Sequence, residues 1–532
     1  MKKDEKSLVT PWYKDKLMVA GALLVILLAA FTLRISNIEN IPYSIFPDEA
    51  QNGIDAQNAN TTGQYKLFYE SNNGREGLFI NIQAMSIKAF GNTTLGLKFP
   101  SIAFGTLAVL GVFLLASELF GSYLAGLIGA YLTTFSYWAI NFSRIGFRAI
   151  MLPFILTFAF YFLFRGLRTK KLHDFIIAGF IYGLGLHTYI AFRVSPIVLI
   201  VLLISLTITR EKFLKNYWKH VLVFAVAMFI SAAPMLLDFF YWNPQHYASR
   251  TSEISILNPA VNKGSLLPVL AKTFGLSLAK YNFWGDQNMR QNYPPYPILN
   301  PITGVAFLVG LIYIFTAFFH LLYKRFKKKV RDQKFDVYVF LLVWFFALLI
   351  PEFLAYEGNP HALRSIGTLP VVMIISVLPF LWIIKKINSF GNSFKIFILS
   401  ILIAAFAFIA IFDTVKYFVF FASSPAQHAA FEGNLKEVSN YVRLLPPETQ
   451  KNIVTGSMQR LTLQYLNPNL PNITYFYPGQ AASINLTHES NAVIIFTNSD
   501  WETINATRNL FPDITFEQRN NKFEDTFYIL KY

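Results

Sequence analysis

The sequence predicts a mainly α-helical, polytopic membrane protein with about eleven transmembrane helices and a C-terminal α/β domain outside the membrane. Composition is the first reason. Hydrophobic residues make up 54% of the 532 residues and charged residues only 14%, whereas a soluble domain carries about 25% charged residues. The 54 Phe and 27 Tyr exclude a disordered chain, because so much apolar surface must be buried. The other two reasons are the spacing of the apolar stretches and the placement of the basic residues.

The apolar stretches have the length that a bilayer requires, since a membrane helix needs about 20 apolar residues. We predict spans at 17–35, 99–119, 122–140, 149–164, 172–190, 194–209, 221–240, 301–323, 336–355, 365–384 and 396–415. Polar sequence follows the first span without a convincing small-residue cleavage site, so we expect an uncleaved signal anchor. Together these spans and their connections form a predicted transmembrane domain over residues 1–415.

The basic residues predict the orientation of the spans. Five alternate segments hold 23 basic and 5 acidic residues, namely 1–16, 165–171, 210–220, 324–334 and 385–395. The positive-inside rule places these segments, and with them the N-terminus, in the cytoplasm. The rest of the chain is nearly neutral, so the net charge of +16 reflects topology and contact with lipid headgroups, and no nucleic-acid partner is expected. We therefore expect a multi-pass protein of the plasma membrane.

Three long segments are then predicted to face outward, and soluble loops of this length are usually functional. They are a first loop at 36–98, a second large loop at 241–300 and a tail at 416–532. In the tail we expect a small extracytoplasmic α/β domain with helices at 426–445 and 501–510 and strands at 453–456, 473–477, 492–497 and 523–530. Its three Asn-x-Thr sequons, at Asn472, Asn485 and Asn505, matter only in a host that glycosylates asparagine.

Several classes of enzyme find no support in the sequence. It contains no cysteine, which excludes disulfides and thiolate metal sites. It also lacks the His-Glu-x-x-His, P-loop and Gly-x-Ser-x-Gly motifs of zinc hydrolases, NTPases and serine hydrolases. Ionisable groups close to lipid are costly, so those that occur there are functional candidates. In this chain they gather at the outward helix ends and in the outward loops.

The first loop opens with two adjacent carboxylates, Asp48 and Glu49, directly after Pro47. In a helix that begins there, the two side chains point about 100° apart and face different partners. A carboxylate in a partly dry pocket suits a general base or a group that orients a ligand. The alternative is structural, with Asp48 as the helix N-cap and Glu49 compensating the helix dipole.

The same loop ends in Arg75 and Glu76, which stand between Gly74 and Gly77. Glycines let a backbone approach a ligand closely, and the planar guanidinium of Arg75 suits a phosphate. The alternative is a tight turn whose arginine reaches the membrane interface.

Basic residues recur on the outward side, where the positive-inside rule does not call for them. Arg144 and Arg148 lie four apart between the third and fourth spans, and Arg193 follows the fifth span, shortly after His187 and Tyr189. Such arginines suit a monophosphate or diphosphate group. His187 is either a ligand or a satisfied core residue.

Two further outward loops mix acids, bases and amides between rigid Pro and flexible Gly. The second large loop holds Asp286 and Arg290, and the loop before the tenth span holds Glu357, His361 and Arg364. We regard these side chains as candidates for contact with a substrate.

These features together resemble a known family, the GT-C type membrane glycosyltransferases. The branch is the one that contains protein O-mannosyltransferases and the aminoarabinose transferases of lipid A. The resemblance covers most of the membrane part, and an outward soluble tail also fits it. It rests on the Asp48-Glu49 pair, the interfacial segment at 78–90, the run Phe142-Ser143-Arg144-Ile145-Gly146-Phe147-Arg148 and the run Pro360-His361-Ala362-Leu363-Arg364.

The resemblance implies a GT-C fold and transfer of a sugar from a polyprenyl-phosphate donor to an acceptor hydroxyl on a glycan, a lipid or a protein, with inversion. It implies that Asp48 is the catalytic base and Glu49 its helper. The residues expected to bind the donor phosphate are Arg75, Arg144, Arg148, Arg193 and Arg364. The residues expected to contact substrate are Glu76, Tyr189, Asp286, Arg290, Glu357 and His361. No cofactor is required and no metal ligand set is predicted, although carboxylates and His361 leave a divalent metal open.

Two other classes of function stay open at this point. A transporter or flippase for lipid-linked sugars often shows inverted repeats and broken helices, and the sequence shows no internal repeat. A non-catalytic scaffold would instead present the domain at 416–532 to a partner.

Overall fold

The computed structural model describes residues 12–248, 255–328, 332–387, 389–486, 491–512, 514–521, 523 and 526–531. Contacts within the chain divide it into two compact units. Within the described residues, the helical unit falls in 1–36, 101–143 and 148–415. The loop–tail unit falls in 37–100, 144–147 and 416–532. The first loop thus belongs to the same unit as the tail.

Each predicted span is helical. Nine of the spans contain the longer helices α1 (Lys16–Ile35), α4 (Thr94–Phe120), α7 (Met151–Thr169), α9 (Pro196–Thr209), α10 (Phe213–Leu237), α14 (Pro301–Lys328), α15 (Lys334–Phe353), α16 (Leu369–Ile387) and α17 (Asn392–Val415). Two predicted spans form shorter helices, α5 (Tyr123–Phe135), which α6 (Tyr137–Ser143) follows, and α8 (Leu172–Leu184). Among the described residues, nine helical stretches are long and apolar enough to cross a membrane, and α5 and α8 are shorter apolar helices.

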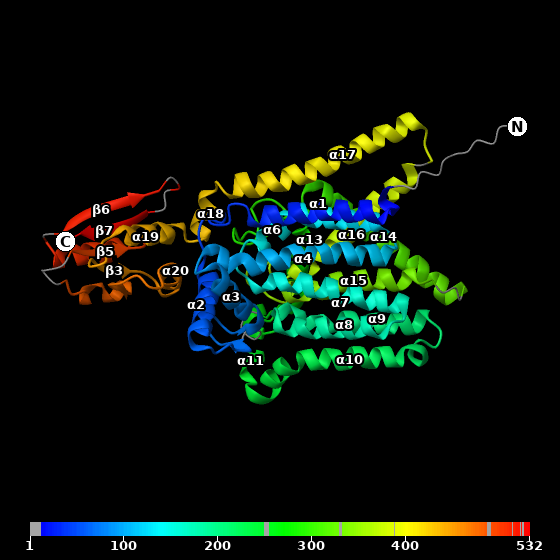
Figure 1. The fold of residues 1–532 in the computed structure, drawn as a ribbon, viewed down its shortest axis with the longest axis horizontal. Coiled ribbons are helices and arrows are strands. Elements are labelled where there is room, and N and C mark those ends of the chain that lie inside the picture. The colour runs from blue at the N-terminus through cyan, green and yellow to red at the C-terminus, as the bar shows by residue number, and fades with distance from the viewer. Residues whose placement is uncertain are drawn as a thin grey trace. The chain divides into compact units, whose positions relative to one another are not determined.

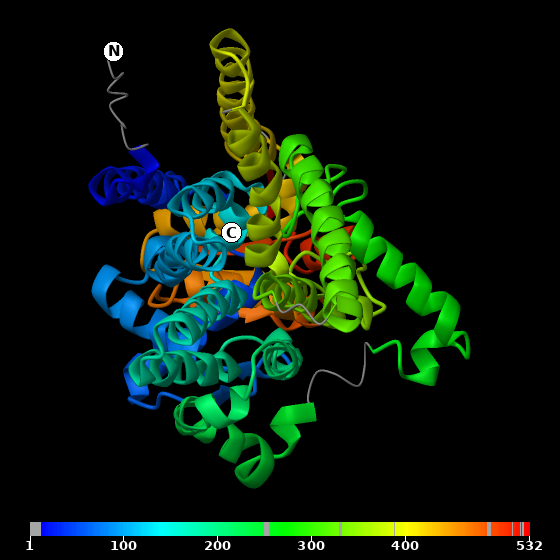
Figure 2. The ribbon, with the colours of Figure 1, turned by 90° about the vertical axis from the view of Figure 1, so that its right-hand side faces the viewer.

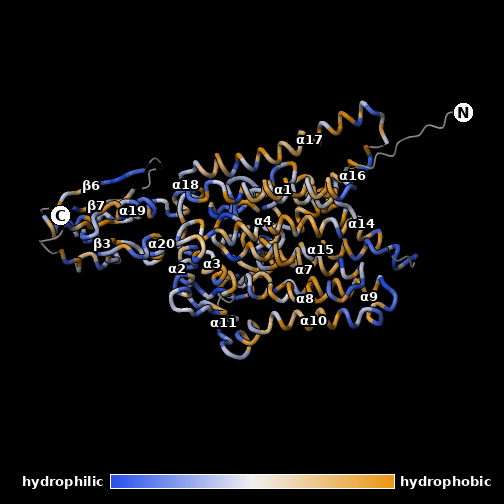
Figure 3. The backbone as a smooth tube through the Cα atoms, in the orientation of Figure 1, coloured by the Kyte–Doolittle hydropathy of each residue, from blue (hydrophilic) through white to orange (hydrophobic). Residues whose placement is uncertain are grey.

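The helices of the helical unit lie roughly parallel to one another in Figure 1, and Figure 2 views them close to end-on. They are hydrophobic over most of their length (Figure 3). Glycines bring α8 close to α10, because a Cβ on Gly179 or Gly183 would overlap the backbone oxygen of Phe224 or Met228. Small residues at such contacts are typical of helices that pack within a membrane.

The predicted loop at 241–300 is partly helical. α10 continues into a π-helical turn at Asp238–Trp242, and short helices follow as α11 (Gln245–Ala248) and α12 (Pro259–Asn262). The longer, apolar α13 (Leu266–Ala279) precedes an irregular segment that leads into α14.

The first loop is also structured. It contains α2 (Pro47–Thr62), the two-stranded ribbon of β1 (Phe68–Tyr69) and β2 (Arg75–Glu76), and α3 (Gly77–Phe90). Ile80 and Ala84 of α3 pack with Ala50 and Ala56 of α2 and with Leu97 in the first turn of α4. This apolar cluster fixes α2 and α3 against each other.

The tail begins with a π-helical segment at Lys416–Phe421 and continues with α18 (Pro425–Ala430), α19 (Gly433–Leu444), α20 (Ser457–Leu466) and α21 (Trp501–Leu510). Its strands are β3 (Gln450–Val454), β4 (Ile473–Phe476), β5 (Ala492–Phe496), β6 (Thr515–Asn520) and β7 (Thr526–Lys531), in the order β4-β3-β5-β7-β6. β3 is parallel to β4 and β5, and β7 is antiparallel to β5 and β6.

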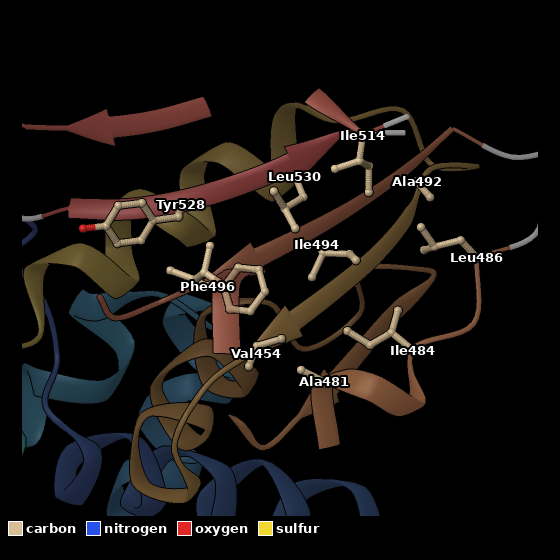
Figure 4. Close-up of a cluster of buried hydrophobic side chains, with 11 residues drawn as sticks. Val454, Ala481, Ile484, Leu486, Ala492, Ile494, Phe496, Ile514, Tyr528 and Leu530 are labelled. Carbon is tan, nitrogen blue, oxygen red and sulfur yellow. The ribbon is translucent and has the colours of Figure 1, made fainter. Parts of the chain in front are cut away.

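Both faces of this sheet are covered. Side chains that alternate along β5 and β7, among them Ile494, Phe496 and Leu530, form one cluster with Ile484 (Figure 4). The alternate set packs against α19 and α20, so every residue of β5 is buried. A strand buried on both faces has a continuous apolar sequence, and Ala492–Phe496 fits that pattern.

The tail contains the predicted strands and helices, with three differences. The predicted helix at 426–445 is two helices, because Glu432 adopts a left-handed backbone conformation (φ 55°) between α18 and α19. The other differences are α20 and β6, which lie in stretches left without structure by the sequence analysis. The described part of the tail contains both helices and a mixed sheet, which is consistent with the predicted α/β domain.

Candidate functional site

Helix α2 begins at Pro47 because the local sequence favours a helix start there. Proline has a fixed φ and no N–H to satisfy, so it suits the first helical position. Asp48 and Glu49 follow in the first turn, where negative side chains are favourable near the positive end of the helix dipole. An Oε of Glu49 also accepts a hydrogen bond from the N–H of Phe46 at 3.4 Å. The helix ends at Gly63, which adopts a left-handed conformation (φ 72°).

Glu49 is fully buried. Its Oε1 accepts a hydrogen bond from the N–H of Gly146 and lies 3.9 Å from Nζ of Lys98, which is also fully buried. Burial raises the pKa of Glu49 above its ordinary value, and the positive charge of Lys98 opposes that shift. The side chain therefore lies in a dry environment with defined partners.

The segment 144–147 is held by both helices of the first loop. The carbonyl of Gly146 accepts hydrogen bonds from Nδ2 of Asn52 at 2.9 Å and from Nε2 of Gln83 at 3.3 Å. With the Glu49 contact, both backbone polar groups of Gly146 are satisfied. This anchoring places Arg144, whose Nη2 donates to the carbonyl of Ile41 at 2.8 Å.

Arg144 is a buried cation among aromatic rings. Its guanidinium carbon lies 5.3 Å from the ring centre of Tyr417 and 5.0 Å from that of Phe418. Stacking on aromatic rings is typical of arginine. Desolvation lowers the pKa of Arg144, and its contact with Tyr417 opposes that shift.

Asp48 has different surroundings from Glu49. It is partly exposed, and its Oδ1 accepts a hydrogen bond from Nδ2 of Asn72 at 2.7 Å. Asn72 stands in a turn where it and the next two residues have positive φ. This turn, formed by residues between β1 and β2, brings an amide to Asp48 while the carboxylate keeps contact with solvent.

Arg75 is buried and anchors the same turn to α2. Its guanidinium pairs with Asp55 and donates to Asn52, and its Nε donates to the carbonyl of Ser71 at 3.1 Å. Glu76, the next residue in β2, is also buried. Asp48, Glu49, Arg75 and Glu76 are thus brought together in one unit by α2 and the β1–β2 ribbon.

A second group of the sequence-predicted residues lies in the helical unit. The guanidinium carbon of Arg148 lies 5.6 Å from the ring centre of Tyr189. Arg193 lies 4.7 Å from the ring centres of Phe239 and Tyr247 and donates to the Tyr247 carbonyl at 2.8 Å. His187 is buried, and its Nε2 lies 2.9 Å from the carbonyl of Ser231, as expected of a satisfied core histidine.

The loops at 285–292 and 357–364 meet in the helical unit. Asp286 accepts hydrogen bonds from the N–H groups of Ala362 at 2.7 Å and Asn288 at 2.8 Å, and burial raises its pKa to about 7. Nε2 of His361 lies 3.3 Å from Nε2 of Gln291. Burial lowers the pKa of His361 well below its ordinary value. Asp286 thus connects the two loops.

Arg290, Glu357 and Arg364 lie in the same loops. Arg290 contributes its carbonyl, which accepts from Nδ2 of Asn141 at 2.9 Å. Arg364 donates to the carbonyl of Glu357. Neither contact of these two arginines involves Asp48, Glu49 or Arg75 of the first loop.

Comparison with known proteins identifies the architecture. Residues 78–237 match the family model described as dolichyl-phosphate-mannose-protein mannosyltransferase. The solved structure of ArnT from Cupriavidus metallidurans bound to undecaprenyl phosphate is 11% identical, with a TM-score of 0.53 over 97% of each chain. The apo ArnT structure is 10% identical, with a TM-score of 0.54 over 97% of each chain. This chain has the GT-C fold. A comparison with curated protein sequences found no match.

The GT-C resemblance inferred from sequence motifs is thereby confirmed at the level of fold, and the resemblance to the ArnT and mannosyltransferase branch is supported by both comparisons. Across the described residues, no group of three or more His, Asp and Glu side chains forms a metal-binding cluster.

The GT-C fold contains charged residues that the sequence analysis did not select. Lys98 faces Glu49, and a second fully buried pair joins Lys280, directly after α13, to Glu352 near the end of α15. Oε1 of Glu352 also accepts the N–H of His361 at 3.0 Å. Lys98, Lys280 and Glu352 all lie at the ends of apolar helices, where an ionisable side chain is costly. That signal was present in the sequence and could have drawn attention to them.

Proposed function

We propose that the chain is an integral membrane glycosyltransferase that moves a hexose or pentose from a polyprenyl-phosphate donor to an acceptor hydroxyl. The transfer takes place on the extracytoplasmic side of the plasma membrane by a single, inverting displacement. The GT-C fold supports the reaction class, and the ArnT structure with undecaprenyl phosphate supports the class of donor.

The observation that carries the proposal is the contrast between the two carboxylates of α2. Asp48 is partly exposed and oriented by the Asn72 amide, whereas Glu49 is enclosed and bonded to Gly146. A general base needs access to the hydroxyl that it deprotonates. Asp48 therefore takes the role of base. Glu49 helps by fixing the segment that carries Arg144.

The chemistry of the donor explains the arginines. The sugar leaves a lipid phosphate, so negative charge builds up on the leaving group, and preorganised cations lower the barrier. The proposed phosphate ligands are Arg75, Arg144, Arg148, Arg193 and Arg364. The guanidinium of Arg75 already pairs with Asp55, and its five donors allow a phosphate to share it. Proposed substrate contacts are Glu76, Tyr189, Asp286, Arg290, Glu357 and His361.

The decisive experiment is an assay of sugar transfer from a polyprenyl-phosphate sugar with Asp48→Asn. Loss of the base should lower the rate by at least about a hundredfold, while thermal stability in detergent stays near that of the wild type. Glu70→Gln, an exposed carboxylate of the same loop, is the matched control and should keep its activity. Full transfer by a correctly inserted Asp48→Asn enzyme would refute the assignment.

Two further measurements define the limits of the proposal. The scheme needs no metal, so activity should survive a chelator. Liposomes that contain the protein alone should not translocate a labelled lipid-linked sugar. Translocation without transfer would favour a flippase, and a scaffold would show neither reaction.

A further inference from the structure

The C-terminal domain holds the helix that carries Asp48. Both belong to the loop–tail unit, and α20 of the tail packs directly on α2. The buried ring of Tyr465 joins the apolar cluster that Ile45, Ala50 and Ile80 of the first loop form. A residue more than 400 positions along the chain from Asp48 is therefore part of the core under α2.

Gly53 accommodates this ring. It lies in the interior of α2, where glycine is unfavourable because it costs conformational entropy and buries no side chain. A Cβ at residue 53 would overlap the aromatic ring of Tyr465. The glycine is thus explained by the close approach of α20, about one and a half turns after Asp48.

Hydrogen bonds fix the ends of this contact. Oγ1 of Thr462 donates to the carbonyl of Ile45 at 3.3 Å, two residues before α2 begins. The carbonyl of Tyr465 accepts from Nδ2 of Asn92 at 3.1 Å, and its hydroxyl donates to the carbonyl of Thr93 at 3.3 Å. α20 is therefore joined to the entry of α2 and to the connection between α3 and α4.

The preceding helix of the tail holds the chain that leads into α2. Nζ of Lys436 in α19 donates to the carbonyls of Glu39 at 2.8 Å and Tyr43 at 3.0 Å, and it lies 4.6 Å from the centre of the Tyr43 ring. The hydroxyl of Tyr43 bonds to Glu437, the next residue of α19. Two consecutive helices of the tail thus make these contacts: α19 binds the segment before α2, and α20 packs on α2.

From this arrangement we infer that the C-terminal domain acts as a positioning element for the catalytic helix, with Tyr465 against Gly53 as the key contact. The inference rests on the proposed function, because it assigns catalytic importance to the place of Asp48. It predicts that the domain sets the turnover number, and it assigns the domain no contact with the donor.

The test combines kinetics with a probe that does not depend on activity. Because the chain has no cysteine, Asn58→Cys at an exposed position of α2 accepts a single spin label. Tyr465→Ala should increase the mobility of this label and lower kcat by about tenfold or more, since small misplacements of reacting groups have large effects. The KM for the donor should stay within about twofold. Met458→Ala, on an exposed face of α20, should change neither quantity.

A second pair of variants protects the test against simple misfolding. Gly53→Ala should impair turnover by pushing the ring away, and Tyr465→Leu should make room for the added methyl. The double variant should therefore be more active than the product of the two single effects predicts. Tyr465→Phe keeps the ring and loses only the hydrogen bond to Thr93, so turnover should fall much less than in Tyr465→Ala.

The possible results separate the inference from the proposed function. Unchanged kcat and label mobility in Tyr465→Ala, or independent effects of Gly53→Ala and Tyr465→Leu, would overturn the positioning role. If Asp48→Asn keeps full activity while the label still responds to Tyr465→Ala, the tail positions α2 but Asp48 is not the base. If Asp48→Asn is inactive and Tyr465→Ala is not impaired, only the positioning role fails.

Discussion

Asp48 and Glu49 are neighbours in sequence that meet opposite surroundings. Successive residues of a helix point about 100° apart, so one carboxylate reaches the Asn72 turn and solvent while the other enters the core of the first loop. In the proposed reaction, environment rather than residue type separates the roles of the two side chains, as in other sites where two carboxylates share one reaction. The buried Glu49 holds the segment around Gly146 in place, so its loss should mainly lower the stability of the fold.

We predict that Glu49→Ala lowers the free energy of unfolding by about 3 kcal/mol, because it leaves the buried Lys98 without a counter-charge. Glu49→Gln combined with Lys98→Met removes both charges and should recover much of that loss. Thermal unfolding in detergent measures both effects. Glu70→Ala, at an exposed carboxylate, serves as the control. A Glu49→Ala protein as stable as this control would mean that the pair contributes little.

Asp286 gives a prediction about pH. Burial and the nearby negative charge of Glu352 raise the pKa of Asp286 from 3.8 to about 7. The two N–H donors and the positive charge of Lys280 oppose this shift. The folded protein then holds a proton that the unfolded chain loses above about pH 4. The contribution of Asp286 to stability is greatest below that pH and falls, by a few kcal/mol in all, as the pH rises to about 7, where it levels off. Melting curves from pH 4 to 8 should show this slope in the wild type and a weaker one in Asp286→Asn. Equal slopes would contradict the assignment.

At this scale the sequence indicates the residues but not their partners. Asp48 and Glu49 stand out because carboxylates are rare beside membrane helices, yet the partner of Glu49 is a backbone N–H 97 positions away. Arg75 has the residue type and place of a phosphate ligand, and its pairing with Asp55 and Asn52 follows only from the packing of the ribbon on α2. Its role, like that of the other site residues, stays a prediction.

At the scale of elements, α5 and α8 decide how many times the chain crosses the membrane. α4 ends at Phe120, 22 residues after Lys98, and so carries the chain about 33 Å away from Lys98. Nevertheless Gly146 lies against Glu49 and Asn52 of the first loop. The 20 residues of α5 and α6 must therefore bring the chain back, as a membrane crossing does. α8, between basic segments at 165–171 and 210–220, fits the same role.

We predict that both short helices cross. Single cysteines at Tyr123, Lys171 and Lys215 would then all lie in the cytoplasm and react with a membrane-impermeant maleimide only after permeabilisation. Asn58→Cys in the first loop should react in intact cells. Labelling of the Lys171 variant in intact cells would exclude a crossing by α5, and labelling of the Lys215 variant alone would exclude one by α8.

The elements themselves were largely predictable from hydropathy, because every predicted span is helical and the continuous apolar sequence of β5 is typical of a buried strand. β6 and α20 were not predicted, for physical reasons. Thr515–Asn520 is a polar edge strand with exposed residues, so it lacks the alternation that reveals a half-buried strand. α20 is a short amphipathic helix whose apolar side chains point to partners elsewhere in the chain, including the first loop.

At the scale of the whole molecule, contacts join segments that the linear order separates. The sequence predicts a domain boundary at residue 416, whereas packing groups the first loop and 144–147 with the tail. Loop and tail must therefore lie on the same side of the membrane. The first loop follows one crossing of the membrane and the tail follows nine or eleven. Because all of these numbers are odd, either count places the loop and the tail on the side opposite the N-terminus. The charge pattern predicts that this side is extracytoplasmic, because the basic segments are predicted to be cytoplasmic.

We therefore predict that the tail is extracytoplasmic whatever the exact number of spans. A cysteine in place of Asn469, exposed in the turn after α20, should react with an impermeant maleimide in intact cells. A cysteine in place of Lys386, exposed at the end of α16, should react only after permeabilisation. The two sites report opposite sides in one assay, so each controls for the other. Protection of the Asn469 variant, with the Asn58 variant labelled, would contradict the packing of tail on first loop. Protection of both would reverse the orientation and with it the proposed side of sugar transfer.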